Sequence, residues 1–311
     1  MRISDGTVVR NYMSTLTKKS EQRGADALKV ATGRSFMAAS DDPVAAIKAM
    51  QLRRSLARTG DFGANISELH GVLSEREAAV SEVSDILTEI SGLLIQGVSG
   101  TYSAQDRQSV AATLRACQQT VFGIANGAYN DKFIFGGADE YQKPFSLDAA
   151  GGLCYQGVAV DTGAFLPERI DMDIGFGAGV NRVSSGAMML GTGVDADGLS
   201  DNIYNFIGQV AAAFEVDDLS MAGLFTEKLK TIHADLTVRY AQIGASSEFM
   251  EMFGDRLVAS RLNLTERQTA IEGADPAEAI MRYNQSSSVY DAALAMGAKM
   301  LPQTLMDYLS R

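Results

Sequence analysis

Two long stretches of the 311-residue sequence place apolar residues at alternating spacings of three and four, from Ile66 to Leu94 and from Phe225 to Ile271. This alternation keeps one stripe of a helix facing a partner helix, as in a coiled coil. We therefore expect one long helix from Asp42 to about Val98, and another over the second stretch that is ~70 Å long at 1.5 Å per residue. Gly60 and Gly63 predict a break or kink in the first helix.

A short motif with the pattern D-P-x-x-A-I occurs near both ends of the chain. The sequence SDDPVAAI occupies residues 40–47, and GADPAEAI occupies residues 273–280. Aspartate is a strong N-cap because its carboxylate accepts hydrogen bonds from unpaired backbone N–H groups, and proline suits the first helical position. We therefore predict that Asp42-Pro43 and Asp275-Pro276 each begin a helix, with Glu278 giving the second a capping-box pattern.

The helices predicted at the two chain ends also carry apolar stripes. Little of the remaining sequence is left to cover these stripes within one chain, and apolar stripes without cover need partners. The sequence therefore predicts self-assembly through the terminal helices, while a helical bundle within one chain remains an alternative. The predicted assembly interface comprises Val9, Met13, Leu16, Ile280, Tyr283, Tyr290, Leu294, Leu301, Leu305 and Tyr308.

The region between the long helices differs in composition. Residues 136–198 hold thirteen of the thirty glycines, which favours turns over helix. Short runs at 158–160 and 170–174 predict strands, the second with clear alternation. Ser103, with Asp106 three residues later, predicts the start of a further helix before this region. The expected fold class is therefore mainly α, with a small β-rich insert and long coiled-coil-like helices built from both chain ends.

The same patterns predict three domains. Residues 1–40 and 275–311 would form a terminal helical domain for self-assembly. Residues 41–135 and 199–274 would form a core of long helices, and residues 136–198 would form a β-rich outer module.

The sequence gives little support for catalysis, and we expect no enzymatic activity, catalytic residue, cofactor or metal site. His70 and His233 have no metal-ligand partner at a usual spacing. The stretch GFGAG at 175–179 lacks the full G-x-G-x-x-G pattern, and DADG at 195–198 lacks the other ligands of a calcium loop. Cys117 lies on a helical apolar stripe, where a buried hydrophobic role is expected.

The charge and hydropathy of the chain restrict its partners. The net charge of −11 argues against a general nucleic-acid binder. Residues 1–60 nevertheless hold eleven Lys or Arg and only five Asp or Glu, so the negative excess lies in the rest of the chain. Either solvated helix faces or complementary packing between neighbouring subunits would explain this asymmetry. The N-terminus lacks the apolar region of a signal peptide, and no apolar run is long enough to span a membrane.

Three segments resemble the bacterial flagellin superfamily. ATGRSFMAASDDPVAAI at 31–47 is similar to its N-terminal signature, with a D-D-P closer to the hook–filament junction branch than to flagellin. DKFIFGGADEYQKPF at 131–145 resembles the short strand after the first helical arm of that branch. RLNLTERQTAIEGADPAEAIMRYNQSSSVYDAALAMGAKMLPQTLMDYL at 261–309 resembles the C-terminal signature of the superfamily.

This resemblance implies a layered, flagellin-like architecture without catalytic activity. The terminal helices would pair in an inner tube, the D-P turns would mark where the chain leaves that layer, and the β module would face outward. The implied partners are further copies in a helical array, a neighbouring hook-associated protein, flagellin and an export chaperone. The implied location is the extracellular flagellum at the hook–filament junction. The chain would be exported by the flagellar type III apparatus without a cleaved signal peptide and without membrane insertion.

Two other functions remain open at this point. A short flagellin, the bulk subunit of the filament, would show the same terminal signatures. A secreted adhesin or enzyme would use the β module, and a ligand pocket with convergent acids around Asp161, Asp171 or Asp173 would favour it.

Overall fold

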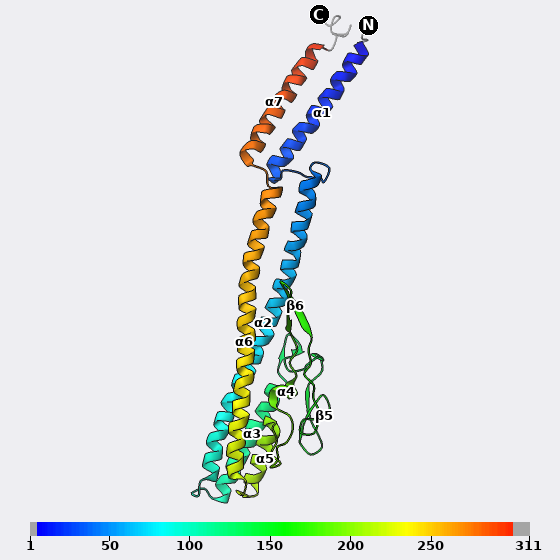
Figure 1. Cartoon of the computed structure of the whole chain (residues 1–311). Coiled ribbons are helices and arrows are strands. Elements are labelled where there is room, and N and C mark those ends of the chain that lie inside the picture. The colour runs from blue at the N-terminus through cyan, green and yellow to red at the C-terminus, as the bar shows by residue number, and fades with distance from the viewer. Residues whose placement is uncertain (1–4, 301–311) are drawn as a thin grey trace, which may run out of the picture. The chain divides into compact units, whose positions relative to one another are not determined.

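The computed structural model describes the backbone of residues 5–300 and the side chains of residues 7–298 (Figure 1). Most of the described chain is helical, and the strands are short, which confirms the expected fold class. The helices are α1 (Asp5–Thr32), α2 (Pro43–Val98), α3 (Ala104–Ala125), α4 (Gly186–Leu190), α5 (Ile203–Glu215), α6 (Ala222–Glu272) and α7 (Pro276–Met300).

The strands form small antiparallel sheets between α3 and α4. Strands β1 and β2 form one hairpin, β3, β4 and β5 form a three-stranded sheet, and β6 and β7 form a second hairpin. Strand β6 covers the predicted alternating run, and β5 covers most of the shorter one. The strands are β1 (Ala128–Tyr129), β2 (Lys132–Phe133), β3 (Phe145–Leu147), β4 (Leu153–Tyr155), β5 (Val158–Ala159), β6 (Asp171–Gly175) and β7 (Ala178–Asn181).

The two long helices predicted from the apolar spacing are α2, with 56 residues, and α6, with 51 residues. Helix α2 runs without interruption through Gly60 and Gly63, so the predicted break is wrong, while the alternative of a kink stays a prediction. A glycine inside a helix costs only about 1 kcal/mol relative to alanine. Burial of the apolar stripe that follows, beginning with Ile66 and Leu69, offsets that cost.

By its internal contacts the chain divides into two compact units. The terminal unit comprises residues 1–59 and 259–311, and the central unit comprises residues 60–258. The division into three domains stays a prediction.

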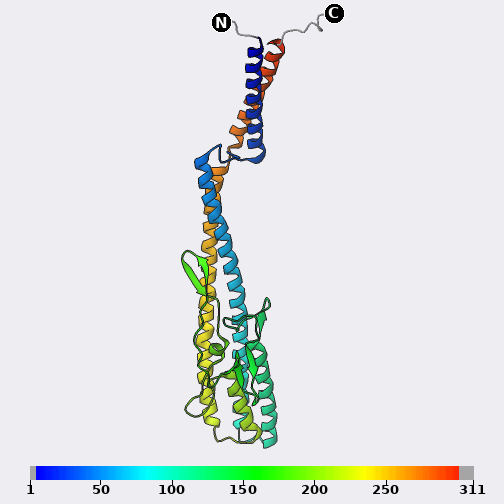
Figure 2. The same ribbon diagram turned by 90° about the vertical axis from the view of Figure 1, so that its right-hand side faces the viewer.

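The central unit contains the main hydrophobic core. Helices α3 and α5 pack side by side, and they lie along α2 and α6 in both views (Figures 1 and 2). The predicted stripe of α2 is buried, from Ile66 at 8% exposure to Leu94 at 1%. The capping box predicted for α3 is present, because Ser103 and Asp106 exchange side chain–backbone hydrogen bonds.

Arg76 occupies one position of the buried stripe of α2. Its Nε donates to the carbonyl oxygen of Ile134 at 2.8 Å, and its Nη2 donates to that of Arg182 at 3.0 Å. Burial lowers the pKa of Arg76 to about 10, so the guanidinium remains charged at neutral pH. A long cationic side chain at an apolar position therefore attaches the β-rich region to α2.

The two cysteines are free and buried, without a disulfide between them. Cys117 lies in the hydrophobic core on α3, as the spacing predicts. Burial raises the pKa of its thiol, which keeps the sulfur protonated and unreactive near neutral pH.

Candidate assembly surface

The two D-P motifs cap the helices that follow them. Asp42 Oδ1 accepts a hydrogen bond from the backbone N–H of Ala45 at 2.9 Å, and α2 begins at Pro43. Asp275 Oδ1 accepts one from the N–H of Ala277 at 2.9 Å, and α7 begins at the next proline. Glu278 does not complete a capping box, because its carboxylate pairs with Arg282 one turn further on.

The segments that precede the two motifs are joined by backbone hydrogen bonds. Arg34 and Gly273 form an antiparallel bridge. Ser35 N donates to the carbonyl oxygen of Glu272 at 2.8 Å, and Ala274 N donates to that of Gly33 at 2.9 Å. Gly33 has a φ of +66°, a conformation that suits glycine, and it ends α1 at this bridge. The end of α1 therefore lies beside the point where α6 gives way to α7.

An ion pair supports the same junction. Both guanidinium nitrogens Nε and Nη2 of Arg53 contact the carboxylate of Glu272 at 2.8 Å. The Glu272 side chain is 9% exposed, whereas that of Arg53 is 49% exposed. The hydrogen bonds from Arg53 hold the pKa of Glu272 below its ordinary value, and a hydrogen bond from Gln268 acts in the same direction. The sequence gives no signal for this pair, because its members are 219 residues apart.

Helices α1 and α7 lie side by side and run antiparallel from the bridge (Figures 1 and 2). The Tyr12 hydroxyl donates to the carbonyl oxygen of Ala293 at 2.9 Å, and its ring occupies the space left by the missing side chain of Gly297. The guanidinium of Arg23 lies over the ring of Tyr290, 4.3 Å from its centroid. Tyr12 is not among the residues that the apolar spacing selects.

The structure divides the predicted interface residues into two groups. Val9, Leu16, Tyr283 and Tyr290 are half-buried. By contrast, three predicted residues remain exposed: Met13, Ile280 and Leu294. The remaining three predicted residues, Leu301, Leu305 and Tyr308, lie outside the described residues.

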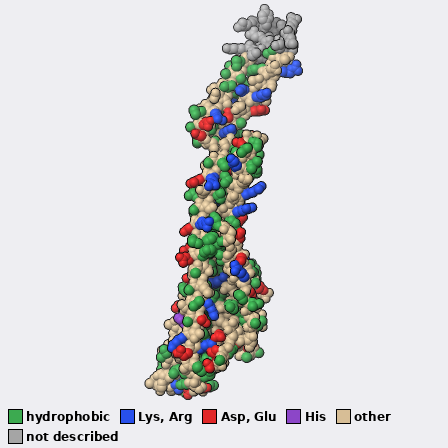
Figure 3. All heavy atoms as spheres, viewed as in Figure 1, with side chains coloured by type: hydrophobic (Ala, Val, Ile, Leu, Met, Phe, Trp, Pro, Cys, Tyr) green, Lys and Arg blue, Asp and Glu red, His purple; other side chains and the backbone are tan. Residues whose placement is uncertain are grey.

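The terminal unit leaves many large hydrophobic side chains exposed, while the apolar residues at its described buried positions are small. The buried positions include Ala46 and Ala49 on α2, with Ala279 and Gly297 on α7. Exposed hydrophobic side chains that gather on one unit favour an interaction site. Figure 3 shows hydrophobic side chains on the surface of this unit. The exposed ones are Val8, Met13, Leu28, Val30, Met37, Val44, Ile47, Met50, Leu262, Ile280, Met281, Val289, Leu294 and Met296.

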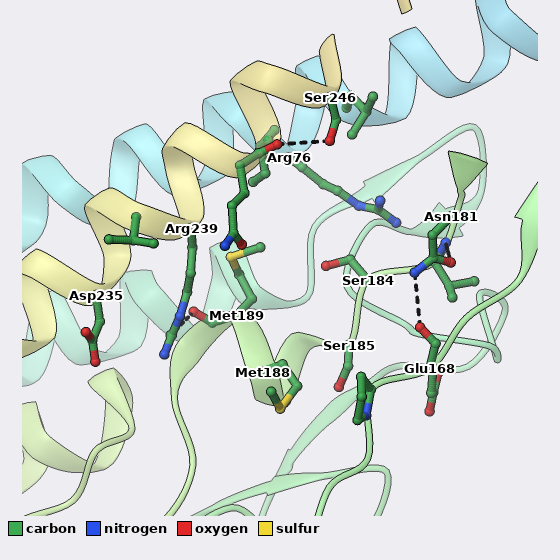
Figure 4. A pocket seen from close by; sticks show the side chains of 16 residues that line it. Arg76, Glu168, Asn181, Ser184, Ser185, Met188, Met189, Asp235, Arg239 and Ser246 are labelled. Carbon is green, nitrogen blue, oxygen red and sulfur yellow. Dashed lines mark hydrogen bonds between the residues drawn. The ribbon is translucent and has the colours of Figure 1, made fainter. Parts of the chain in front are cut away.

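The central unit contains a pocket of about 610 Å³ between the β-rich region and the long helices (Figure 4). Its two arginines both donate to backbone carbonyl oxygens, and Arg239 Nη1 donates to Met189 at 2.7 Å. The carboxylates of Glu168 and Asp235 lie at opposite ends of the pocket in Figure 4.

The acids that would favour an adhesin or enzyme lie elsewhere. Asp161, Asp171 and Asp173 do not line this pocket. Asp161 accepts hydrogen bonds from Ser200 and Asn205, whereas the other two are exposed on β6. This pocket therefore does not provide the convergent acids that would favour an adhesin or enzyme.

The histidines and acidic loops do not form a metal centre. His70 Nε2 lies 3.8 Å from Glu251, and His233 lies 3.4 Å from the Ser84 hydroxyl. Asp195, in the DADG stretch, pairs with Lys228. Among residues 5–300 no group of three or more His, Cys, Asp or Glu is placed to hold a metal ion. Within the same range, no helix combines the length and apolar character needed to cross a bilayer.

Two family models match the chain, and both describe bacterial flagellins. The bacterial flagellin N-terminal helical region matches residues 3–140, and the bacterial flagellin C-terminal helical region matches residues 226–309. Together these matches include both D-P motifs and most of the described helices, so they cover well over half of the chain.

Curated relatives fall into two groups. The chain is 27% identical over 153 residues to flagellar hook-associated protein 3 of Salmonella typhimurium, which is 49% of this chain and 48% of that protein. It spans about half the length of this relative and of the Escherichia coli protein of the same name. It is also 24% identical to flagellin FlaB1 of Treponema pallidum, over 92% of this chain and 91% of that protein.

Solved structures support the fold. A protein assigned as a flagellar hook-associated protein from Vibrio parahaemolyticus matches with a TM-score of 0.64 and 18% identity, over 75% of this chain and all of that one. FlgL of Bacillus cereus matches with a TM-score of 0.56 and 20% identity, over 70% of this chain and 99% of that one. At these identities the likeness shows a shared fold.

The Gly297→Ala variant tests the close contact between α1 and α7. A Cβ at this position would overlap the Tyr12 ring, so we expect it to destabilise the helix pair by about 1–3 kcal/mol. Faster amide hydrogen exchange in residues 5–32 and 276–300 measures the effect. Gly24→Ala is the matched control, because a Cβ there meets nothing within 4 Å and should leave the exchange unchanged or slower. Equal exchange in the two variants would contradict the contact.

The Glu272→Gln variant tests the ion pair with Arg53. The folded-state pKa of Glu272 lies below its usual 4.5. The ion pair therefore stabilises the fold above pH 4.5, and this stabilisation is lost as the pH falls through the folded-state pKa. We expect the variant to lose about 1 kcal/mol or less at neutral pH, because Arg53 is half-exposed and screened. The difference should shrink at acidic pH.

Hydrogen exchange in residues 33–58, followed from pH 7 to acidic pH, measures this difference. Glu266→Gln, at an exposed position of the same helix, is the control and should match the wild type at every pH. A Glu272→Gln effect that is independent of pH would contradict the assignment.

Proposed function

Because the chain belongs to the bacterial flagellin superfamily, we propose that it is a structural subunit of the bacterial flagellum and assembles through its terminal helices. The exposed hydrophobic side chains of the terminal unit carry this proposal. They lie within the two segments that match the flagellin helical regions. Further copies in a helical array would bury these side chains, and burial stabilises by roughly 25 cal/mol for each Å² of apolar surface.

Within the flagellum, the proposed position is the hook–filament junction, as an adaptor between the zone of hook-associated proteins and the flagellin filament. The D-D-P motif and the relatives named flagellar hook-associated protein 3 support this position. The proposed partners are further copies, a neighbouring hook-associated protein and flagellin, with an export chaperone before assembly. Export through the flagellar type III apparatus, without a cleaved signal peptide, belongs to the same proposal. Catalysis has no part in it.

A second candidate is a short flagellin, the bulk subunit of the filament. The observation that favours it is the alignment with flagellin FlaB1 of Treponema pallidum over 92% of this chain, against about half for the hook-associated relatives. Assembly through terminal helices would be the same in both cases. The two candidates differ in abundance and in what remains when the protein is removed.

Deletion of the gene distinguishes the candidates. For a junction adaptor we expect intact hooks without filaments in electron micrographs, together with flagellin released into the medium. The physical reason is that flagellin would still be exported but would have no surface on which to assemble. Loss of filaments without any flagellin in cells or medium would identify the chain as the filament subunit. Normal filaments would reject both candidates.

The Leu294→Asp variant tests assembly through α7. Leu294 is 43% exposed, so a carboxylate there should leave the helix pair folded while opposing burial against a neighbour. We expect loss of complementation of the deletion, with circular dichroism close to that of the wild type. Asn284→Asp, at another exposed position of α7, adds the same charge without removing a large apolar side chain and should complement. Normal filaments with Leu294→Asp would reject this part of the interface.

A further inference from the structure

An exposed face of α2 in the terminal unit combines apolar and basic side chains. Val44, Ile47, Lys48, Arg54 and Arg58 follow helical spacings that place them on one side of the helix. Val44 is 63% exposed and Ile47 is 53% exposed. The three cations form no ion pair with another described residue. We call this face the basic ridge. Figure 3 shows hydrophobic side chains together with Lys or Arg side chains over the first part of α2.

A groove of opposite charge lies in the central unit. It has a volume of about 310 Å³ between α2 and α6, and it is open because Gly63 and Gly254 on its walls have no side chains. Its other lining residues are mostly apolar, and Val258 at its edge is 70% exposed. The groove is lined by Gly63, Ile66, Ser67, His70, Met250, Glu251, Gly254, Leu257 and Val258.

Carboxylates follow the edge of this groove along α6. Glu251 lines it, and Glu248 and Asp255 lie one turn before and one turn after on the same side of the helix. All three are exposed. Glu251 Oε1 lies 3.8 Å from His70 Nε2, and the other two form no ion pair with a described residue. We call the groove with these carboxylates the acidic groove.

The basic ridge cannot fill the acidic groove of its own chain. The ridge ends at Arg58, and the wall that α2 contributes to the groove begins at Gly63. Both segments belong to one uninterrupted α-helix from Pro43 to Val98. Because a continuous helix cannot fold back on itself, only another molecule can bring a ridge into this groove.

We propose that the basic ridge of one copy packs into the acidic groove of a second copy. Val44 and Ile47 would enter the groove beside Val258, and the ridge cations would face the carboxylates of α6. The contact is heterologous, because each copy keeps a free ridge and a free groove, and such contacts generate rings or helical arrays. The inference rests on the proposed assembly function and specifies one of its contacts between copies.

Charge reversal with full-length chains tests this contact. One variant carries Arg54→Glu and Arg58→Glu, and the other carries Glu251→Lys and Asp255→Lys. Like charges would then face each other across the contact, so each variant alone should self-associate more than about tenfold more weakly than the wild type. Sedimentation velocity at low ionic strength measures the association, and added salt should weaken that of the wild type.

A mixture of the two variants gives the decisive result. Each ridge in the mixture then has an oppositely charged groove on the other variant, so association should return to near the wild-type level. The control variant, Arg169→Glu with Lys230→Glu, changes the net charge by the same amount as the ridge variant at exposed positions outside both surfaces. It should associate like the wild type.

Cross-linking reports the geometry directly. Copies with Ile47→Cys mixed with copies with Val258→Cys should give a covalent dimer with a short bis-maleimide, whereas neither variant alone should. The native cysteines are buried and should contribute little. The proposal is overturned if the wild type remains monomeric, if the reversed variants associate normally, or if their mixture does not recover. Capture of flagellin by the ridge without capture of a second copy would also overturn it.

The proposed contact and the proposed function can be rejected independently of each other. Loss of filaments on deletion, followed by full complementation with both reversed variants, would retain the flagellar role and reject this contact. Normal filaments on deletion, together with recovery in the mixture, would retain the contact and reject the flagellar role.

Discussion

The backbone bridge between Arg34 and Gly273 is the point on which the terminal unit depends. It places the end of α1 beside the junction of α6 and α7. Because a helix rises 1.5 Å per residue, a register fixed at this point extends along the whole of α1 and α7. Each D-P motif follows one of the two segments that form the bridge, which is why the same local sequence occurs twice. Each one restarts a helix after the chain has crossed this junction.

The choice of small residues at the buried positions of this unit follows from how closely its helices approach. Tyr12 fits against α7 only because residue 297 has no side chain. Large apolar side chains such as Met13 on α1 and Leu294 on α7 then have no place inside the pair and remain exposed. The terminal unit therefore buries few large apolar side chains among its own described residues. The central unit differs, because its large apolar residues, such as Leu87 and Phe214, are buried among its own helices.

The sequence predicted the parts of the fold that depend on periodicity. The three–four spacing identified α2 and α6, and the capping residues located the starts of α2, α3 and α7. The break that it predicted at Gly60 is absent, because local helix propensity is outweighed by burial of the stripe that follows. It could not find the pair of Arg53 and Glu272, since no local pattern links residues in different helices.

The spacing of apolar residues also does not predict which neighbouring helix covers an apolar stripe. A spacing of three and four groups Val9 with Met13 on α1, yet Val9 is half-buried and Met13 is exposed. The fine placement depends on Tyr12 and Gly297, a polar aromatic residue and a glycine that a search for apolar positions passes over. For an assembling protein this distinction separates the residues that hold one copy together from those that are free to join two.

The uneven charge of the chain bears on the residues that are free to join two copies. At physiological ionic strength the Debye length is about 8 Å, so exposed ion pairs add little net affinity. Exposed apolar side chains such as Ile47 and Val258 must then supply most of the stabilisation of any contact between copies. Apolar contacts have little directional preference, whereas opposite charges favour one pairing of faces and disfavour two like faces. A basic face on one unit and an acidic face on the other therefore favour head-to-tail contact over a symmetric dimer, and only head-to-tail contact can extend into an array.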